Sequence, residues 1–100
     1  MKVEITWQDD RTLRISGELS FNTVSQLSQQ AETIIAKNKY LIIDLSGVNR
    51  SDSAGLAMLL AWSKAAEDYQ ASLKFINPPE QIQRIAAISN VAEILKFNEP

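Results

Sequence analysis

A short apolar segment in the middle of the chain sets the strongest limit on the fold. Residues 40–43 (YLII) follow one another without a polar break, and the segment ends at Asp44-Leu45. An uninterrupted apolar run of this length is typical of a β-strand that is covered on both faces. Because helical patterns precede and follow this strand, we expect it to lie inside a sheet whose connections run through helices.

The N-terminal part of the chain predicts a β-hairpin. Residues 3–7 (VEITW) alternate apolar and polar side chains, Asp9-Asp10 supply a turn, and residues 13–15 (LRI) alternate again. This period of two indicates paired strands with one buried face.

Three later segments carry helical patterns. We expect the first helix to run from an N-cap at Asn22 to about Asn38, with its apolar positions on one stripe. The second extends from Ser53 to about Tyr69. The third has Pro79 in its first turn, where the missing N–H of proline is tolerated.

The remaining segments complete a single domain over residues 1–100. Residues 46–52 are predicted to form a polar loop, residues 73–76 a short strand, and residues 91–97 a last helical turn and closing segment. A chain of this length supports one hydrophobic core. The predicted fold is therefore α/β: an open mixed β-sheet with an N-terminal β-hairpin and with helices packed mainly on one face.

The chain lacks Cys and His, two residue types on which many catalytic and metal sites are built. With no Cys the chain has no disulfide, no thiolate nucleophile and no sulfur-based zinc site. With no His it lacks the usual general base near neutral pH. It contains no G-x-x-x-x-G-K-[ST] phosphate loop, and its acidic residues form no paired cluster at helical spacing. We therefore expect no catalytic residue, no cofactor and no metal.

Charge and hydropathy limit the partners. The 12 acidic and 10 basic residues give a net charge of −2 without a basic stripe, so a nucleic-acid partner is not expected. Residues 1–10 do not resemble a signal peptide, and the longest apolar stretch, Leu56 to Trp62, is too short to span a membrane. We expect a cytoplasmic protein without direct membrane insertion.

The segment Asp52-Ser53-Ala54-Gly55 stands out because it opens the second predicted helix. Unpaired backbone N–H groups and the helix dipole favour negative charge there. Glycine in a first turn costs helix stability, so something other than propensity favours Gly55. Two interpretations are open. Ser53 is a plain N-cap worth about 1 kcal/mol and Gly55 fits tightly under a neighbouring loop, or the segment is a binding site.

The second predicted helix has a wide apolar arc. Its apolar residues cover roughly 200°, against about 100° for a helix packed on one side only. Either the first and third helices cover the additional side, or Met58, Trp62 and their neighbours lie partly open and receive a partner. In the second case Ser53, at the head of the helix, lies at the edge of the contact.

Three motifs together resemble the STAS domain family. They are Gly17-Glu18-Leu19, Asp44-Leu45-Ser46-Gly47-Val48 and Asp52-Ser53-Ala54-Gly55-Leu56. The resemblance covers nearly the whole chain, including residues 73–79 before the third helix. It implies a non-catalytic domain that works by binding another protein.

The resemblance implies two alternative partners, of which we favour the first. In the stand-alone STAS subunit of the Mla phospholipid-trafficking ABC transporter, the domain docks on the cytoplasmic ATPase subunit and supports its activity. This would place the chain at the inner face of the inner membrane. In bacterial anti-anti-sigma factors, the serine matching Ser53 is phosphorylated by a partner kinase that is also the anti-sigma factor. Ala54 replaces the second serine of that motif without removing the acceptor.

Both alternatives point to one group of residues. A phosphate on Ser53 would add about −1.5 to −2 charges and disrupt an uncharged, closely packed contact. The candidates for partner binding or phosphorylation are Ser53, Asp52, Ala54, Gly55, Met58 and Trp62.

Overall fold

The computed structural model describes residues 3–95 and 97. In that part of the chain, one sheet has its strands in the order β1-β2-β3-β4. The elements follow one another as β1 (Val3–Trp7), β2 (Thr12–Leu19), α1 (Phe21–Lys37), β3 (Tyr40–Ser51), α2 (Ser53–Asp68), β4 (Ser72–Ile76), α3 (Glu80–Ile88) and α4 (Ala92–Leu95).

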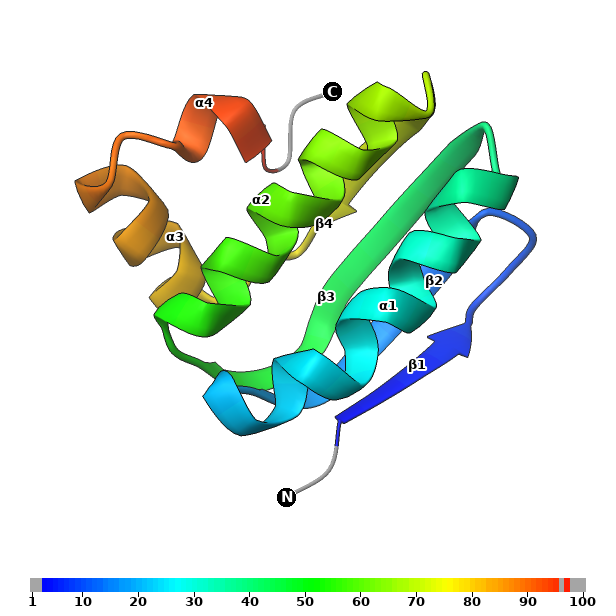
Figure 1. The fold of residues 1–100 in the computed structure, drawn as a ribbon. Coiled ribbons are helices and arrows are strands. Elements are labelled where there is room, and N and C mark those ends of the chain that lie inside the picture. Colours follow the sequence, from blue (N-terminus) through cyan, green and yellow to red (C-terminus); the bar gives the residue numbers. More distant parts are fainter. Residues whose placement is uncertain (1–2, 96, 98–100) are drawn as a thin grey trace.

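The strand pairing confirms the predicted mixed sheet with its N-terminal hairpin. β1 pairs with β2 in antiparallel orientation, whereas β2 with β3 and β3 with β4 are parallel. The two parallel connections run through α1 and α2, which lie in front of the sheet in Figure 1. The strand predicted from the apolar run at residues 40–45 is paired on both sides, as expected.

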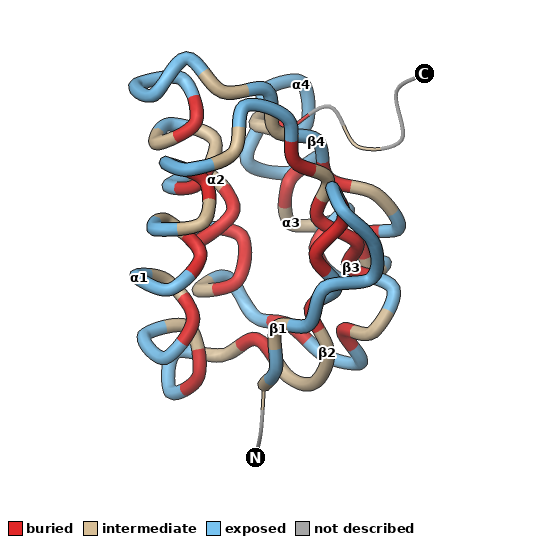
Figure 2. Tube along the Cα trace, turned by 90° about the vertical axis from the view of Figure 1, so that its right-hand side faces the viewer, coloured by how far each residue is buried: buried red, intermediate tan, exposed pale blue. Residues whose placement is uncertain are grey.

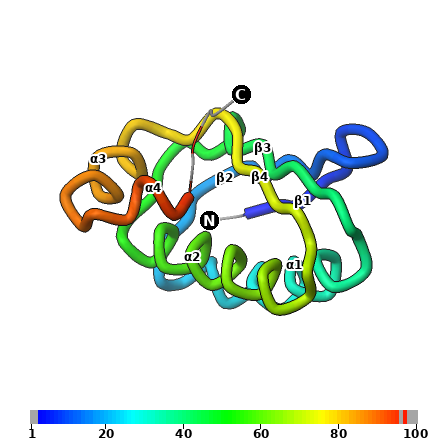
Figure 3. The backbone as a smooth tube through the Cα atoms, turned by 90° about the horizontal axis from the view of Figure 1, so that it is seen from above, coloured from blue at the N-terminus to red at the C-terminus, as the bar shows by residue number. Residues whose placement is uncertain are grey.

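The core lies between the sheet and the two long helices. Seen from above, α1 and α2 cover the same face of the sheet, and α3 and α4 lie together at one side of the molecule (Figure 3). Figure 2 shows buried residues gathered where these helices face the strands. Side chains with almost no exposed surface come from both layers, among them Leu13, Ile15, Ile43, Leu45, Leu59 and Trp62.

The expectation that the central strand is covered on both faces is wrong for most of the second face, on which Asp44 is buried but Tyr40 is not. Along β3, Leu41, Ile43 and Leu45 are buried, while Tyr40 is 60% exposed and Ile42 is half-buried. The physical reason is that α1 and α2 pack on one face of the sheet, so alternate side chains of β3 point to the other face.

The expected polar loop at residues 46–52 is also wrong, because β3 continues to Ser51. Its second half pairs with β2 as far as Leu19, with two irregularities in the register. Val48 is buried in this extension. The polar residues that suggested a loop are side chains of a strand with one exposed face, which the composition alone does not distinguish from a turn.

The helix boundaries agree with the sequence except at two starts. α1 begins at Phe21 with Ser20 as its N-cap, not at Asn22. The backbone N–H of Ser20 donates to Thr23 Oγ1 at 2.9 Å, which satisfies a donor at the helix start. Pro79 is the N-cap of α3 and does not lie in its first turn. The second helix runs from Ser53 to Asp68 with Tyr69 as its C-cap, as predicted.

The described residues include neither a membrane-spanning helix nor a cluster of metal-binding side chains. No helix within residues 3–95 is long and apolar enough to cross a membrane. The same part of the chain contains no group of three or more acidic, His or Cys side chains placed to hold a metal ion.

Candidate functional site

The segment singled out in the sequence forms the corner at which β3 passes into α2. Asp52 is the N-cap of α2, and its carboxylate accepts a hydrogen bond from the backbone N–H of Ala54 at 2.8 Å. Ser53 is the first residue of the helix, and its side chain is exposed. The interpretation of Ser53 as the N-cap is therefore wrong. Capping is done by Asp52, which leaves the hydroxyl of Ser53 at the surface.

Gly55 is required by close packing beneath this corner. A Cβ added at Gly55 would overlap Ser51 Oγ and lie 3.0 Å from Leu19 Cβ. The tight approach expected from the sequence is present, although the neighbours are the ends of β2 and β3 and not a loop. The strand ends thereby fix the first turn of α2 against the sheet.

A groove lies beside Ser53, between the first turns of α1 and α2. We call it the α1–α2 groove; its volume is about 550 Å³. It is lined by Phe21, Val24, Ser25 and Ser28 from α1 and by Ser53, Ala54, Ala57 and Met58 from α2. None of these residues is charged at neutral pH. Phe21 is 81% exposed, which is unusual for a phenylalanine.

Met58 and Trp62 do not lie partly open, so that expectation is wrong. Met58 is 4% exposed and Trp62 has no exposed surface. The apolar arc of α2 is wide because one part of it faces the sheet and another part faces α1. The outer side of the helix carries the exposed Ala57 and Ala61 instead. Trp62 Nε1 is buried without a hydrogen-bond partner.

Asp44 is a buried residue of β3 and not the end of a strand. Its Oδ1 accepts hydrogen bonds from the backbone N–H of Ser46 at 2.9 Å and from Nδ2 of Asn77 at 3.1 Å. Burial raises the pKa of Asp44, but these hydrogen bonds outweigh it and hold the pKa below its ordinary value. The carboxylate thus ties β3 to the turn between β4 and α3.

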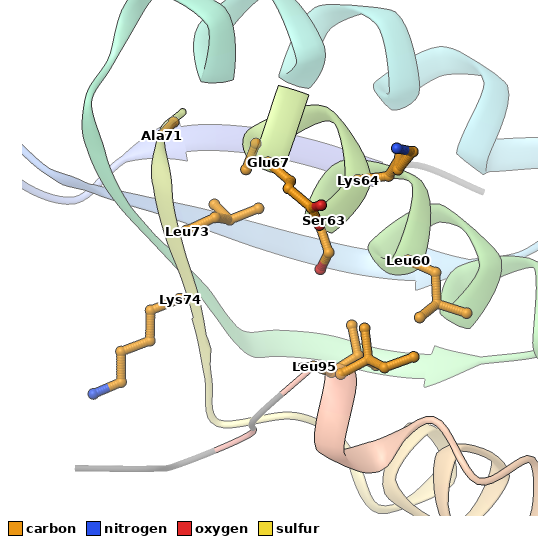
Figure 4. A pocket seen from close by; sticks show the side chains of 10 residues that line it. Leu60, Ser63, Lys64, Glu67, Ala71, Leu73, Lys74 and Leu95 are labelled. Carbon is orange, nitrogen blue, oxygen red and sulfur yellow. The ribbon is translucent and has the colours of Figure 1, made fainter. Parts of the chain in front are cut away.

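A second hollow, of about 640 Å³, lies between the later turns of α2, β4 and α4 (Figure 4). Leu60, Leu73 and Leu95 form much of its apolar wall. Of its charged residues, Lys64 is paired with Asp68 at 3.3 Å. None of the sequence-predicted site residues lines this hollow, so it is separate from the corner at Ser53.

Sequence reasoning missed one residue of the α1–α2 groove and one residue that contacts the corner. Phe21 was not singled out, although an aromatic residue next to a helix start is a visible signal. Gln81 of α3 was also missed: its Oε1 accepts a hydrogen bond from the backbone N–H of Ser51 at 2.7 Å. No local pattern indicates a contact across 30 residues of sequence.

Two solved structures of similar shape define the fold class. A crystal structure of an anti-sigma factor antagonist from Mycobacterium paratuberculosis has a TM-score of 0.79 at 20% identity, covering 99% of this chain and 86% of that one. The Bacillus protein SpoIIAA in its unphosphorylated form has a TM-score of 0.72 at 18% identity, covering 98% of this chain and 89% of that one. The architecture is therefore the one found in anti-sigma factor antagonists.

Sequence comparison names the family. The family model described as "Mlab, STAS domain" matches residues 3–96, so the chain belongs to the STAS domain family. A STAS-domain containing protein of Pseudomonas aeruginosa is 25% identical over 87 residues, covering 87% of this chain and 86% of that protein. An anti-sigma-B factor antagonist of Staphylococcus epidermidis is 25% identical over 96 residues, covering 95% of this chain and 89% of that protein.

Proposed function

We propose that this chain is a non-catalytic STAS domain that binds a protein partner through the surface around Ser53. The partner is the ATPase subunit of a phospholipid-trafficking (Mla-type) ABC transporter. The observation that carries the proposal is the α1–α2 groove, which is lined only by uncharged residues and opens beside the exposed Ser53. The proposed role requires no chemistry from the chain, which has neither His nor Cys.

The groove has the composition of a protein-binding surface. Covering uncharged side chains costs little desolvation, and large aromatic residues are favoured at the centres of interfaces. Phe21 is such an anchor in this proposal, because the residue is 81% exposed in the free chain. Ala57 and Ala61, on the outer side of α2, present small side chains against which a partner helix packs closely.

The transporter assignment is supported by the family description and by the motifs. The matching family model carries the name Mlab, and it spans residues 3–96 of a 100-residue chain. Bound to the ATPase subunit, the domain would work in the cytoplasm at the inner face of the inner membrane and would support assembly or activity of that subunit.

A second candidate function is that of an anti-anti-sigma factor regulated by phosphorylation of Ser53. It is favoured by the Staphylococcus epidermidis relative, which is named an anti-sigma-B factor antagonist, and by SpoIIAA, which has also been solved in a phosphorylated form. The exposed hydroxyl of Ser53 at a helix N-terminus is accessible to a kinase, and the helix dipole stabilises a phosphate there.

Co-purification from the native cell tests the proposal and separates the two candidates. The tagged chain is captured and its bound proteins are identified by mass spectrometry. Recovery of transporter ATPase and permease subunits supports the proposed function. Recovery of a serine kinase that acts as an anti-sigma factor, with labelling that is lost in Ser53→Ala, supports the second candidate and contradicts the first.

Ser53→Glu then tests the contact with the purified ATPase subunit. Burying an unpaired carboxylate is costly, so we expect binding to weaken by more than about 10-fold, which is about 1.4 kcal/mol. Ser89→Glu, an exposed serine at the C-cap of α3, is the matched control and should bind like the wild type. Equal affinities for the wild type and Ser53→Glu would remove Ser53 from the contact.

A further inference from the structure

Gln81 supplies a hydrogen-bond acceptor that the sheet does not provide. The backbone N–H of Asp52 donates to the carbonyl of Leu19 in β2 at 3.0 Å, so the preceding N–H, of Ser51, points to the other side of β3. On that side β4 pairs with β3 only as far as Asp44. Gln81 Oε1 takes the place of a strand there and accepts from Ser51 N at 2.7 Å.

This hydrogen bond is worth a measurable free energy because Ser51 is 5% exposed. A buried N–H left without a partner loses its hydrogen bonds to water and gains none in the protein, which destabilises the fold. The hydroxyl of Ser51 also donates to the carbonyl of Asp52 at 3.0 Å and packs against Gly55. Gln81 therefore acts on the residue that supports both the N-cap and the first turn of α2.

We infer that Gln81 is a positioning residue of the docking surface: through Ser51 it sets the orientation of Ser53 and couples α3 to partner binding. The corner is held between two anchors, the carbonyl of Leu19 on one side and the amide oxygen of Gln81 on the other. Gln81 is itself exposed, so a partner that covers α2 can also reach it. The binding part of this inference rests on the proposed function, whereas the positioning of the corner does not.

Three variants separate the acceptor from other effects of the side chain. Gln81→Met keeps the length but removes the acceptor, and Gln81→Glu restores an acceptor oxygen at the same place. Gln83→Met is the matched control on α3, since Gln83 Nε2 donates to the carbonyl of Pro78 at 3.1 Å, in the turn before α3 and not in β3. Each variant is studied by NMR hydrogen exchange, thermal unfolding and titration with the purified ATPase subunit.

For Gln81→Met we expect the amide of Ser51 to exchange at least about fivefold faster, equivalent to about 1 kcal/mol, and the amides of residues 53–55 to shift. Affinity for the ATPase subunit should fall by a similar factor, and Gln81→Glu should restore both readouts. Gln83→Met should change neither.

Two results would overturn the inference. Unchanged exchange of Ser51 in Gln81→Met would refute the positioning role, whatever the partner. Changed exchange with unchanged affinity, while Ser53→Glu does weaken binding, would show that the corner does not control docking and would leave the proposed function intact. Failure of the proposed function is recognised separately, because wild type and Ser53→Glu would then bind the ATPase subunit equally.

Discussion

Replacing Gly55 with alanine measures the close packing beneath Ser53. The added Cβ would overlap Ser51 Oγ and lie 3.0 Å from Leu19 Cβ and 3.4 Å from Leu19 Cδ1. Overpacking of this kind costs about 1–3 kcal/mol, and the higher helix propensity of alanine returns about 1 kcal/mol. Rotating the Ser51 hydroxyl away would break its hydrogen bond to Asp52, which is worth about 1 kcal/mol. Together these terms give an expected net loss of about 1–3 kcal/mol.

Urea denaturation gives this loss directly, and thermal melts should show a fall of about 4–8 °C for each kcal/mol in a domain of this size. The double variant Ser51→Ala/Gly55→Ala is the matched control. Removing the hydroxyl frees space for the new methyl group, so the double variant should be more stable than the sum of the single effects. A Gly55→Ala variant as stable as the wild type, or more stable, would refute the packing argument.

Further predictions concern stability. Leu59→Ala removes a side chain with no exposed surface and should cost about 2–5 kcal/mol in urea denaturation, and a loss below about 0.5 kcal/mol would contradict its place in the core. Asp52→Ala should lower stability by about 1 kcal/mol in thermal melts because it removes the cap, whereas Ser53→Ala should stay within about 0.5 kcal/mol of the wild type; the reverse order would assign the cap to Ser53. The pKa of Asp44 is held below its ordinary value of 3.8. The ionised carboxylate therefore stabilises the folded state above pH 3.8, and this stabilisation is lost as the pH falls through the folded-state pKa. The advantage of the wild type over Asp44→Asn in free energy of unfolding should therefore be full above pH 3.8 and shrink below it, and a constant difference in acid titrations would rule out this contribution.

Most of the fold was predictable because its signals are local. The alternation in residues 3–7, the apolar run at 40–43 and the helix start at Ser53 are each read within a few residues. The extension of β3 over residues 46–51 was not predictable in this way. Those residues form a strand because β2 pairs with them, and the residue types of a polar segment do not indicate which strand pairs with it.

The candidate site was predictable in part, and for a similar reason. The motif around Ser53 marks a helix start with close packing at Gly55, and the structure has both, although the atoms close to Gly55 belong to side chains and not to the backbone of a neighbour. The burial of Met58 and Trp62 depends on the position of α1. That position cannot be predicted from the helical periodicity of α2. The contact of Gln81 with Ser51 depends on the orientation of α3, so it appears only in three dimensions.

Binding of two matched surface variants tests the central claim, that the domain docks through the α1–α2 groove. Phe21 is 81% exposed and lines the groove, whereas Ile88 is 82% exposed at the end of α3. Phe21→Asp and Ile88→Asp therefore each replace an apolar side chain with a carboxylate at nearly equal exposure, and thermal melts establish that both variants fold.

Calorimetric titration of each variant with the purified ATPase subunit gives the answer. Loss of an aromatic anchor costs about 2 kcal/mol or more, so Phe21→Asp should raise Kd by at least about 30-fold, while Ile88→Asp should bind within about twofold of the wild type. Equal affinity of Phe21→Asp and wild type, or a larger loss for Ile88→Asp, would contradict docking through the groove.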